Sequence, residues 1–250
     1  MRIAVAGGTG VVGRHVVASL ATDGHEPVVL ARSRGVNVVT GQGLDAALTG
    51  VQAVVDVSGL TTTRRRPSVA FFAASTRQLL AAGQRAGVAH YVALSIVAVD
   101  RVDYGYFEGQ RRQEDLALAG QLPASVLRAT QVHEFAGQIL AATPGPLAPV
   151  PRMLIQPVVA REVATRLADL ATGSAVGLAP EFAGSEEHQL VDLTRRLVRS
   201  RGQRRWVIPI RMPGAVGRDM ATGGLLPQTA GPRGTETFDH WLTTFAVDRG

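Results

Sequence analysis

Three glycines near the start of the chain have the spacing of a loop that holds a phosphate group. Gly7, Gly10 and Gly13 stand three residues apart and follow the buried apolar run 3–6. Glycine lets the backbone turn tightly and come close to a ligand. Apolar residues at helical spacing follow over 11–22, so the free N–H groups of that helix point at the loop. The pattern predicts a dinucleotide cradle rather than a simple connecting turn, and its expected members are Gly7, Thr9, Gly10, Val11, Val12 and Gly13.

A basic tripeptide, Arg32-Ser33-Arg34, follows the second apolar run, 27–31. In a doubly wound sheet, the end of the second strand faces the adenosine ribose of a bound dinucleotide. An acidic side chain there would accept hydrogen bonds from the 2′-hydroxyl, whereas an arginine would pair with a 2′-phosphate. Because no Asp or Glu stands here, Arg32 and Arg34 favour NADP(H) over NAD(H); the alternative is two exposed loop arginines.

Polar residues also follow two later apolar runs. Ser58 and Gly59 end the run 50–59, where they would lie beside the pyrophosphate and adenosine, and Ser95 stands near the end of the run 90–96. Ligands of parallel sheets bind beyond the carboxyl ends of the strands, so Ser95 is expected to face cofactor and substrate. A buried serine bonded to the backbone is the alternative.

A further polar cluster follows the apolar run that begins at residue 124. His133 with Glu134 could act as an acid–base pair, and Thr130 with Gln131 could hydrogen-bond the nicotinamide amide. The alternative is a strand that ends in polar loop residues.

The elements that would position these residues alternate between strands and helices. The sequence predicts further strands over 36–40, around 53–57 and from 124, with helices over 67–86 and from 104 to about 120. Alternation of this kind is typical of α/β proteins with a doubly wound, Rossmann-like parallel sheet.

The composition limits the classes of partner. The chain has 250 residues, 46% of them hydrophobic, no cysteine and no lysine, and its net charge is +6. Its arginines are spread along the chain, and the runs 64–66 and 195–205 lack interleaved aromatic residues, so we interpret them as solvated faces or anion contacts rather than a nucleic-acid site. With no apolar run near the roughly 20 residues that span a bilayer, we expect a cytoplasmic protein with no membrane partner and no metal site.

Several segments together resemble the NmrA-like, atypical group of the short-chain dehydrogenase/reductase superfamily. They are, in order, GGTGVVGRHVV, VVLARSR, GVQAVVDVSG, YVALSIVAVDR, YGYFEGQRRQEDL and LRATQVHEF, followed by the tail segments QPVVAREVA and TFDHWL. The resemblance implies one NADP(H)-binding, Rossmann-like domain over 1–250. It also implies a smaller C-terminal substrate lobe, drawn mainly from 144–250, that closes over the nicotinamide. Residues 144–151 would form a rigid proline-rich bridge to that lobe, and the loop-like segment 211–234 a substrate lid.

The resemblance also implies catalytic roles. In such enzymes a serine binds the substrate oxygen, a tyrosine donates or accepts a proton, and a lysine four residues later lowers the tyrosine pKa and holds the ribose. Ser95 and Tyr106 match the first two, but Gln110 stands at the lysine position, and the chain has no lysine. The pKa of Tyr106 is therefore not expected to be lowered, although the Gln110 amide could still bind a ribose hydroxyl.

These observations predict an NADPH-dependent oxidoreductase that reduces a small carbonyl, quinone or enone compound. The proton would come from Tyr106, His133 or water, and the substrate would be a small molecule, with the oligomeric state left open. The alternative function is a non-catalytic NADP(H)-binding redox sensor or regulator, because replacement of the lysine by Gln110 separates cofactor binding from catalysis.

Overall fold

The chain forms two compact units in the computed structural model, which describes residues 1–247 and the side chains of residues 1–244. The first unit comprises Met1–Arg128 and Arg161–Pro180, and the second comprises Ala129–Ala160 and the chain from Glu181 onward. The expectation of a lobe drawn mainly from 144–250 stays a prediction.

The first unit is built on a six-stranded sheet in the order β2-β1-β3-β4-β5-β8. Its strands are β1 (Arg2–Ala6), β2 (Glu26–Leu30), β3 (Ala53–Asp56), β4 (His90–Ile96), β5 (Ala124–Ala129) and β8 (Gly177–Leu178). The pairs β1–β2, β1–β3, β3–β4 and β5–β8 are parallel. Small and β-branched residues fill β1 and β3, which suits strands buried on both faces.

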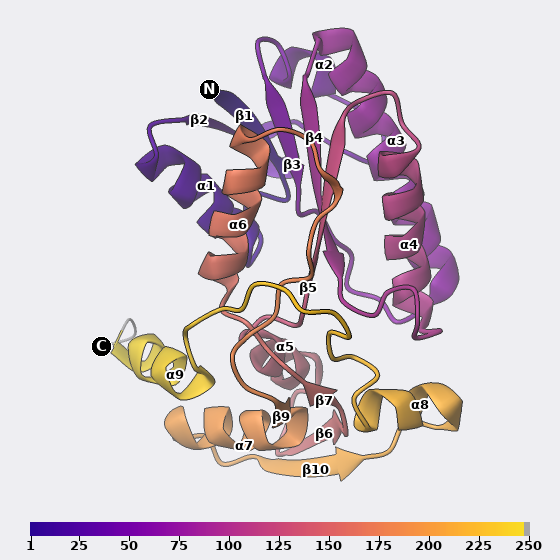
Figure 1. The fold of residues 1–250 in the computed structure, drawn as a ribbon. Coiled ribbons are helices and arrows are strands. Elements are labelled where there is room, and N and C mark those ends of the chain that lie inside the picture. Colours follow the sequence, from indigo (N-terminus) through magenta and orange to yellow (C-terminus); the bar gives the residue numbers. More distant parts are fainter. Residues whose placement is uncertain (248–250) are drawn as a thin grey trace. The chain divides into compact units, whose positions relative to one another are not determined.

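Helices cover both faces of this sheet, as Figure 1 shows: α3 and α4 lie side by side on one face, and α1 and α6 on the other. The helices are α1 (Gly13–Thr22), α2 (Leu44–Ala47), α3 (Arg65–Ala86), α4 (Gly105–Leu118) and α6 (Ala160–Thr172), with a 3-10 turn at Arg32–Arg34. The prediction of an α/β, Rossmann-like doubly wound sheet is therefore confirmed.

The strand predicted over 36–40 is wrong, because these residues form turns. The side-chain oxygen of Asn37 accepts hydrogen bonds from the backbone N–H groups of Val39 and Thr40, at 3.0 and 3.4 Å. An asparagine that bonds its own following backbone competes with sheet pairing and closes a turn instead.

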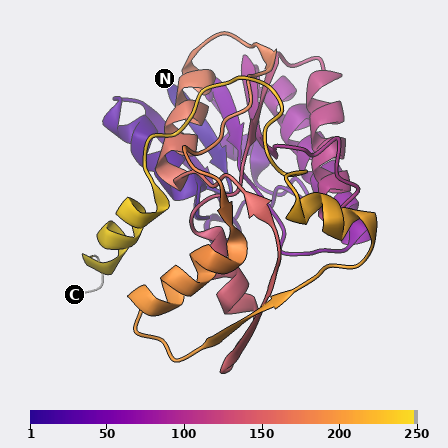
Figure 2. The same cartoon turned by 60° about the horizontal axis from the view of Figure 1, so that its bottom comes forward.

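The second unit contains two small sheets and four helices among its described residues. The parallel pair is β6 (Leu147–Pro151) with β10 (Trp206–Ile210), and the antiparallel pair is β7 (Leu154–Ile155) with β9 (His188–Gln189). The helices are α5 (Phe135–Ala142), α7 (Leu190–Ser200), α8 (Gly214–Ala221) and α9 (Phe238–Val247). Figure 2 brings α7, β10 and α8 forward in orange tones.

Two expectations about this part of the chain are wrong. The proline-rich segment 144–151 is not a bridge, since all of it lies inside the second unit and its residues Leu147–Pro151 form the strand β6. The segment 211–234 is not all loop, since it contains α8. Pro149 and Pro151 are tolerated because β6 belongs to a two-stranded sheet, where both strands are edge strands.

Ala98, in the turn after β4, has a φ of 68°, and it is the only non-glycine residue with positive φ in the described chain. A side chain in this left-handed region costs roughly 1–2 kcal/mol. We therefore expect Ala98→Gly to stabilise the protein by about 0.5–1 kcal/mol, after the extra entropy of glycine in the unfolded chain is subtracted.

Urea unfolding would measure this change, with Ala119→Gly as its control. Ala119 has an ordinary φ of −88°, so glycine there should lower the free energy of unfolding. An equal loss of unfolding free energy in both variants would contradict backbone strain at Ala98.

Candidate functional site

The glycine loop between β1 and α1 is packed so tightly that side chains at two of its glycines would clash. Gly7 has a φ of +79°, and a Cβ there would lie 2.7 Å from the carbonyl oxygen of Val57. A Cβ on Gly13 would lie 2.1 Å from the carbonyl oxygen of Gly7. The first glycine thus lets β1 approach the end of β3, and the last lets α1 start directly over the loop.

The remaining side of the loop is open and carries unused donors. A Cβ on Gly10 would meet only the Gly7 oxygen, at 3.2 Å. Among the described residues, the backbone N–H groups of Val11 and Val12 have no hydrogen-bond partner, and no side chain caps the helix that follows. Free N–H groups at a helix N-terminus form a site for an anion. This geometry fits the pyrophosphate of a dinucleotide, with Thr9 as part of the same turn.

Arg32 and Arg34 lie in the short 3-10 turn that follows β2. Both side chains are exposed, and neither forms an ion pair within residues 1–247. Gly35 ends the turn with a φ of 76°. Two guanidinium groups are therefore available at the strand end where a 2′-phosphate would bind, and their contact with one stays a prediction.

A buried carboxyl group fixes the position of Ser58 and Gly59. Asp56, the last residue of β3, is fully buried, and its Oδ1 accepts hydrogen bonds from the Ser58 hydroxyl at 2.6 Å and the Ser58 N–H at 2.9 Å. Its Oδ2 accepts from the Tyr91 hydroxyl at 2.7 Å and the Gln113 amide at 3.0 Å. Asp56 thereby joins the loop after β3 to β4 and α4.

Burial dominates the electrostatics of this group. It raises the pKa of Asp56 above its ordinary value, although the bonds from Ser58, Tyr91 and Gln113 act in the opposite direction. Burial, with Asp56 beside it, also raises the pKa of Tyr91 well above 10.0, so its phenol stays protonated and donates.

Tyr106 and Gln110 lie one turn apart on α4. The Gln110 amide donates to the Tyr106 hydroxyl at 3.4 Å, and Gln110 is buried with its Oε1 unpartnered in the described structure. Burial raises the pKa of Tyr106, and the bond from Gln110 only partly offsets this. The phenol is therefore protonated at neutral pH, as expected without a lysine.

The loop after β3 approaches this tyrosine. A Cβ built on Gly59 would lie 3.7 Å from the Tyr106 hydroxyl oxygen. Ser95, in β4, is 2% exposed, and its Oγ has no hydrogen-bond partner among the described residues. Buried polar atoms are nearly always paired in native proteins, so the orphaned oxygens of Ser95 and Gln110 are consistent with groups that a ligand satisfies.

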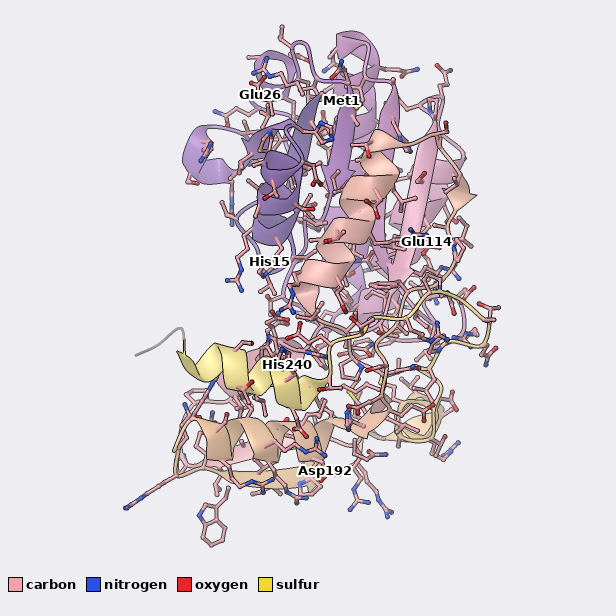
Figure 3. All side chains as sticks on the ribbon, turned by 60° about the vertical axis from the view of Figure 1, so that its left-hand side comes forward. Met1, His15, Glu26, Glu114, Asp192 and His240 are labelled. Carbon is pink, nitrogen blue, oxygen red and sulfur yellow. The ribbon has the colours of Figure 1, made fainter. Side chains whose placement is uncertain are left out.

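A charged cluster holds α4 in place. Arg128, at the end of β5, donates to both carboxylate oxygens of Glu114 on α4, at 2.9 and 2.7 Å, and to Asp100 in the turn after β4, at 2.7 Å. Glu114 is labelled in Figure 3. The Glu114 bond raises the pKa of Arg128 further. Because Arg128 and Glu114 are largely buried, removing one would leave an uncompensated charge. The cluster thus fixes the helix that carries Tyr106.

His133 and Thr130 belong to the second unit. His133 is 2% exposed; its Nε2–H donates to the Pro157 carbonyl at 3.1 Å, and its ring packs edge-on against Phe238 and Trp241. Thr130 is buried and donates its hydroxyl hydrogen to the Gln156 carbonyl at 2.6 Å. Both groups hold backbone within their own unit, and their predicted roles in proton transfer and nicotinamide binding stay predictions.

The first unit therefore gathers most of the predicted residues at the carboxyl ends of its strands. Sequence reasoning missed Asp56, Gln113 and Arg128, which touch no expected ligand but position those that do. The one available signal was an aspartate inside the otherwise apolar run 50–59. Within residues 1–247, there is neither a helix long and apolar enough to cross a membrane nor a group of three His, Asp or Glu side chains that could hold a metal ion.

Solved structures share this fold at low sequence identity. MoeE5 in complex with UDP-glucuronic acid and NAD is similar at a TM-score of 0.76 and 16% identity, over 100% of this chain and 99% of that one. The NADPH-dependent quinone oxidoreductase QOR2 from Escherichia coli, complexed with NADPH, is similar at 0.70 and 18%, over 97% and 99%. A short-chain dehydrogenase/reductase superfamily protein from Agrobacterium tumefaciens with bound NAD is similar at 0.68 and 19%, over 100% and 97%. No protein-family model matches the chain, and no curated protein matches it in sequence.

Proposed function

The chain has the fold of the short-chain dehydrogenase/reductase superfamily, and from that premise we propose that it is an NADPH-dependent reductase of a small carbonyl, quinone or enone compound. The observation that carries this proposal is a tyrosine hydroxyl beside an open dinucleotide cradle. Tyr106 lies at the start of α4 with its hydroxyl close to Gly59, and the glycine loop leaves the N–H groups of Val11 and Val12 unpaired.

Three side chains would have separate roles in the reduction of the substrate oxygen. When bound, the reduced nicotinamide supplies a hydride. Ser95 hydrogen-bonds the substrate oxygen with its unpaired hydroxyl, Tyr106 donates the proton, and Gln110 positions the phenol and the ribose. Positioning contributes most of the rate, because no ammonium group is available to stabilise a tyrosinate.

Burial raises the pKa of Tyr106, so its phenol is protonated at neutral pH and can donate a proton in a reduction. The same raised pKa makes the phenol a weaker acid, and it sets no preferred direction, because oxidation and reduction pass through the same transition state.

Tyr106→Phe tests the reaction directly. NADPH oxidation by the wild type is first followed with a panel of quinones, enones and ketones, and no turnover of any member would contradict the reductase proposal.

With the best substrate, the Tyr106→Phe variant should lose about 100-fold or more in kcat, since general-acid catalysis contributes 10²–10⁴-fold. Its Kd for NADPH should stay within about 2-fold. Tyr104→Phe, which alters a tyrosine two residues away, is the control, and equal losses in both variants would remove Tyr106 from catalysis.

Arg32→Ala should weaken the binding of NADPH much more than the binding of NADH. We expect a roughly 10- to 100-fold higher Kd for NADPH, because a charge-assisted hydrogen bond contributes about 1.5–3 kcal/mol. The Kd for NADH should barely change, since NADH has no 2′-phosphate. Calorimetry measures both, with Arg77→Ala as a control that removes one exposed arginine from α3. Equal losses for both cofactors would exclude a contact between Arg32 and the 2′-phosphate.

A second function has one observation in its favour. The same raised pKa of Tyr106 and the absence of lysine suit a non-catalytic NADP(H)-binding sensor that regulates another protein. Near-equal affinity for NADP⁺ and NADPH, together with no turnover across the panel, would favour this alternative. Measurable turnover that depends on Tyr106 would exclude it.

A further inference from the structure

The second unit contains a cavity that the proposed reaction does not use. It has a volume of about 520 Å³ and is lined by residues of β9, α7, β10 and α8 and by residues that directly follow β6, β10 and α8. Asp192, one of its lining residues, is labelled on α7 in Figure 3. Cavities of about 300–1,000 Å³ accommodate small organic molecules, so this volume suits a ligand rather than a single ion.

Positive charge dominates the lining. Arg152, Arg195, Arg211 and Arg218 all border the cavity, against a single carboxylate, that of Asp192. Asp192 pairs with Arg195 at 3.2 Å, one helical turn away. The other three arginines have no acidic partner in the part of the chain that the structure describes. The lining therefore holds three uncompensated positive charges.

The parallel pairing of β6 with β10 brings two of these charges together. Pro151 pairs with Ile210 in the strand register, so Arg152 and Arg211 are the next residues on neighbouring strands. The N–H of Arg152 donates to the Ile210 carbonyl at 2.9 Å, which fixes this register beyond the strand ends. Like charges on adjacent strands repel. An anion bound between the two guanidinium groups would remove that repulsion.

Gly217 allows the third arginine of the lining, Arg218, to reach the cavity. A Cβ on Gly217 would lie 1.9 Å from the carbonyl oxygen of Met212, so only glycine lets the first turn of α8 pack against the segment before it. Arg218 is the next residue, and it reaches the cavity because α8 lies this close. The walls between the arginines include the apolar side chains of Val191, Pro209 and Met212.

We propose that this cavity binds a small organic anion, in which a phosphate or carboxylate group contacts Arg152, Arg211 and Arg218 and an apolar body lies on the remaining wall. Arginine suits this task because its planar guanidinium offers paired donors to both kinds of oxyanion. The proposal goes beyond the reductase function and does not depend on it, since all the lining residues belong to the second unit.

Calorimetry with two probes tests the site. Phenyl phosphate and benzoate are titrated separately into the full chain saturated with NADP⁺, so that the glycine loop is occupied. We expect saturable binding of at least one probe with a Kd below about 1 mM, and phenol, which lacks the charge, should not bind. The preferred probe identifies the anion class. Failure of both probes to bind would overturn the proposal.

A matched pair of double variants assigns the binding to the cavity. The Arg152→Gln, Arg211→Gln variant should weaken binding of the preferred probe at least about 10-fold, because two charge-assisted contacts are lost. The Arg199→Gln, Arg204→Gln variant removes the same charge from exposed arginines outside the lining, and its affinity should stay within about 2-fold. Equal affinity in both double variants would overturn the proposal. Thermal unfolding of each variant, and its NADPH affinity, should match the wild type.

Discussion

The Gly13→Ala variant is expected to bind NADPH about 10- to 100-fold more weakly than the wild type and to unfold at a lower temperature. The added methyl carbon would lie 2.1 Å from the Gly7 carbonyl oxygen and 2.7 Å from Gly8 Cα. Both contacts are with backbone, which cannot rotate away as a side chain can. The start of α1 must therefore move, and its N–H groups would leave the positions that hold the pyrophosphate.

Two further variants separate cofactor binding from folding. Gly10→Ala places a Cβ on the open side of the loop, where it meets only the Gly7 oxygen at 3.2 Å. It should fold with nearly the wild-type Tm and still bind NADPH at least about 10-fold more weakly. Gly173→Ala, whose Cβ would come no closer than 3.3 Å to other atoms, controls for glycine replacement. Wild-type affinity in both Gly13→Ala and Gly10→Ala would contradict the dinucleotide cradle.

The Asp56→Ala variant is expected to lose about 3–5 kcal/mol of unfolding free energy, near the upper end for single substitutions. Its carboxylate accepts from four donors, two of Ser58 and one each of Tyr91 and Gln113. Alanine would leave these donors without acceptors, in a site closed to water. Because the loop carrying Ser58 and Gly59 would also be released, NADPH binding should weaken.

Asp56→Asn is the matched control, because it retains the shape and one carbonyl oxygen. The oxygen can accept from Ser58. If the Gln113 amide turns over, its Oε1, which has no partner in the described structure, can accept from the new amide. Urea unfolding should therefore show a much smaller loss than for alanine, about 1 kcal/mol. Equal losses would mean that the hydrogen bonds of Asp56 contribute little to stability.

A comparison of the wild type with Asp56→Asn at several pH values tests the raised pKa of Asp56. Burial raises its pKa in the folded protein, so the folded state keeps a proton that the unfolded chain loses above about pH 4. Between these two pKa values the folded state binds more protons, and stability falls as the pH rises. Relative to Asp56→Asn, the wild type should lose unfolding free energy as the pH rises from about 4 toward neutrality. A constant difference between the two proteins over that range would contradict the raised pKa.

Short-range features were predictable because they depend on neighbouring residues. A glycine triplet between an apolar strand and an amphipathic helix can turn only in a few ways, so Gly7, Gly10 and Gly13 indicated the loop directly. The strand His90–Ile96 has the predicted bounds, since its apolar run is continuous. The composition was sufficient to predict the effect of Gln110. A chain without lysine has no side-chain ammonium group that could lower the pKa of Tyr106, and in the folded protein burial raises that pKa.

Long-range pairings were not predictable in this way. Residues 144–151 have the composition of a proline-rich linker, and their second half becomes a strand only because Trp206–Ile210, distant in sequence, pairs with it. The same pairing brings Arg152 beside Arg211. Neither segment by itself contains a signal for the other, because strand register depends on partners that fold beside it.

The sequence by itself determined the doubly wound fold, the glycine loop, the arginines at the end of β2 and the missing lysine, since each follows from local sterics or from residue counts. Only the tertiary structure decided that Asp56 accepts four hydrogen bonds, two from Ser58 and one each from Tyr91 and Gln113, and that Ser95 has an unpaired hydroxyl. It also placed His133 and Thr130 in a different unit from Tyr106. The reason is physical: Asp56 finds Tyr91 and Gln113 at positions 35 and 57 residues away, and the folded backbone alone brings such partners into contact.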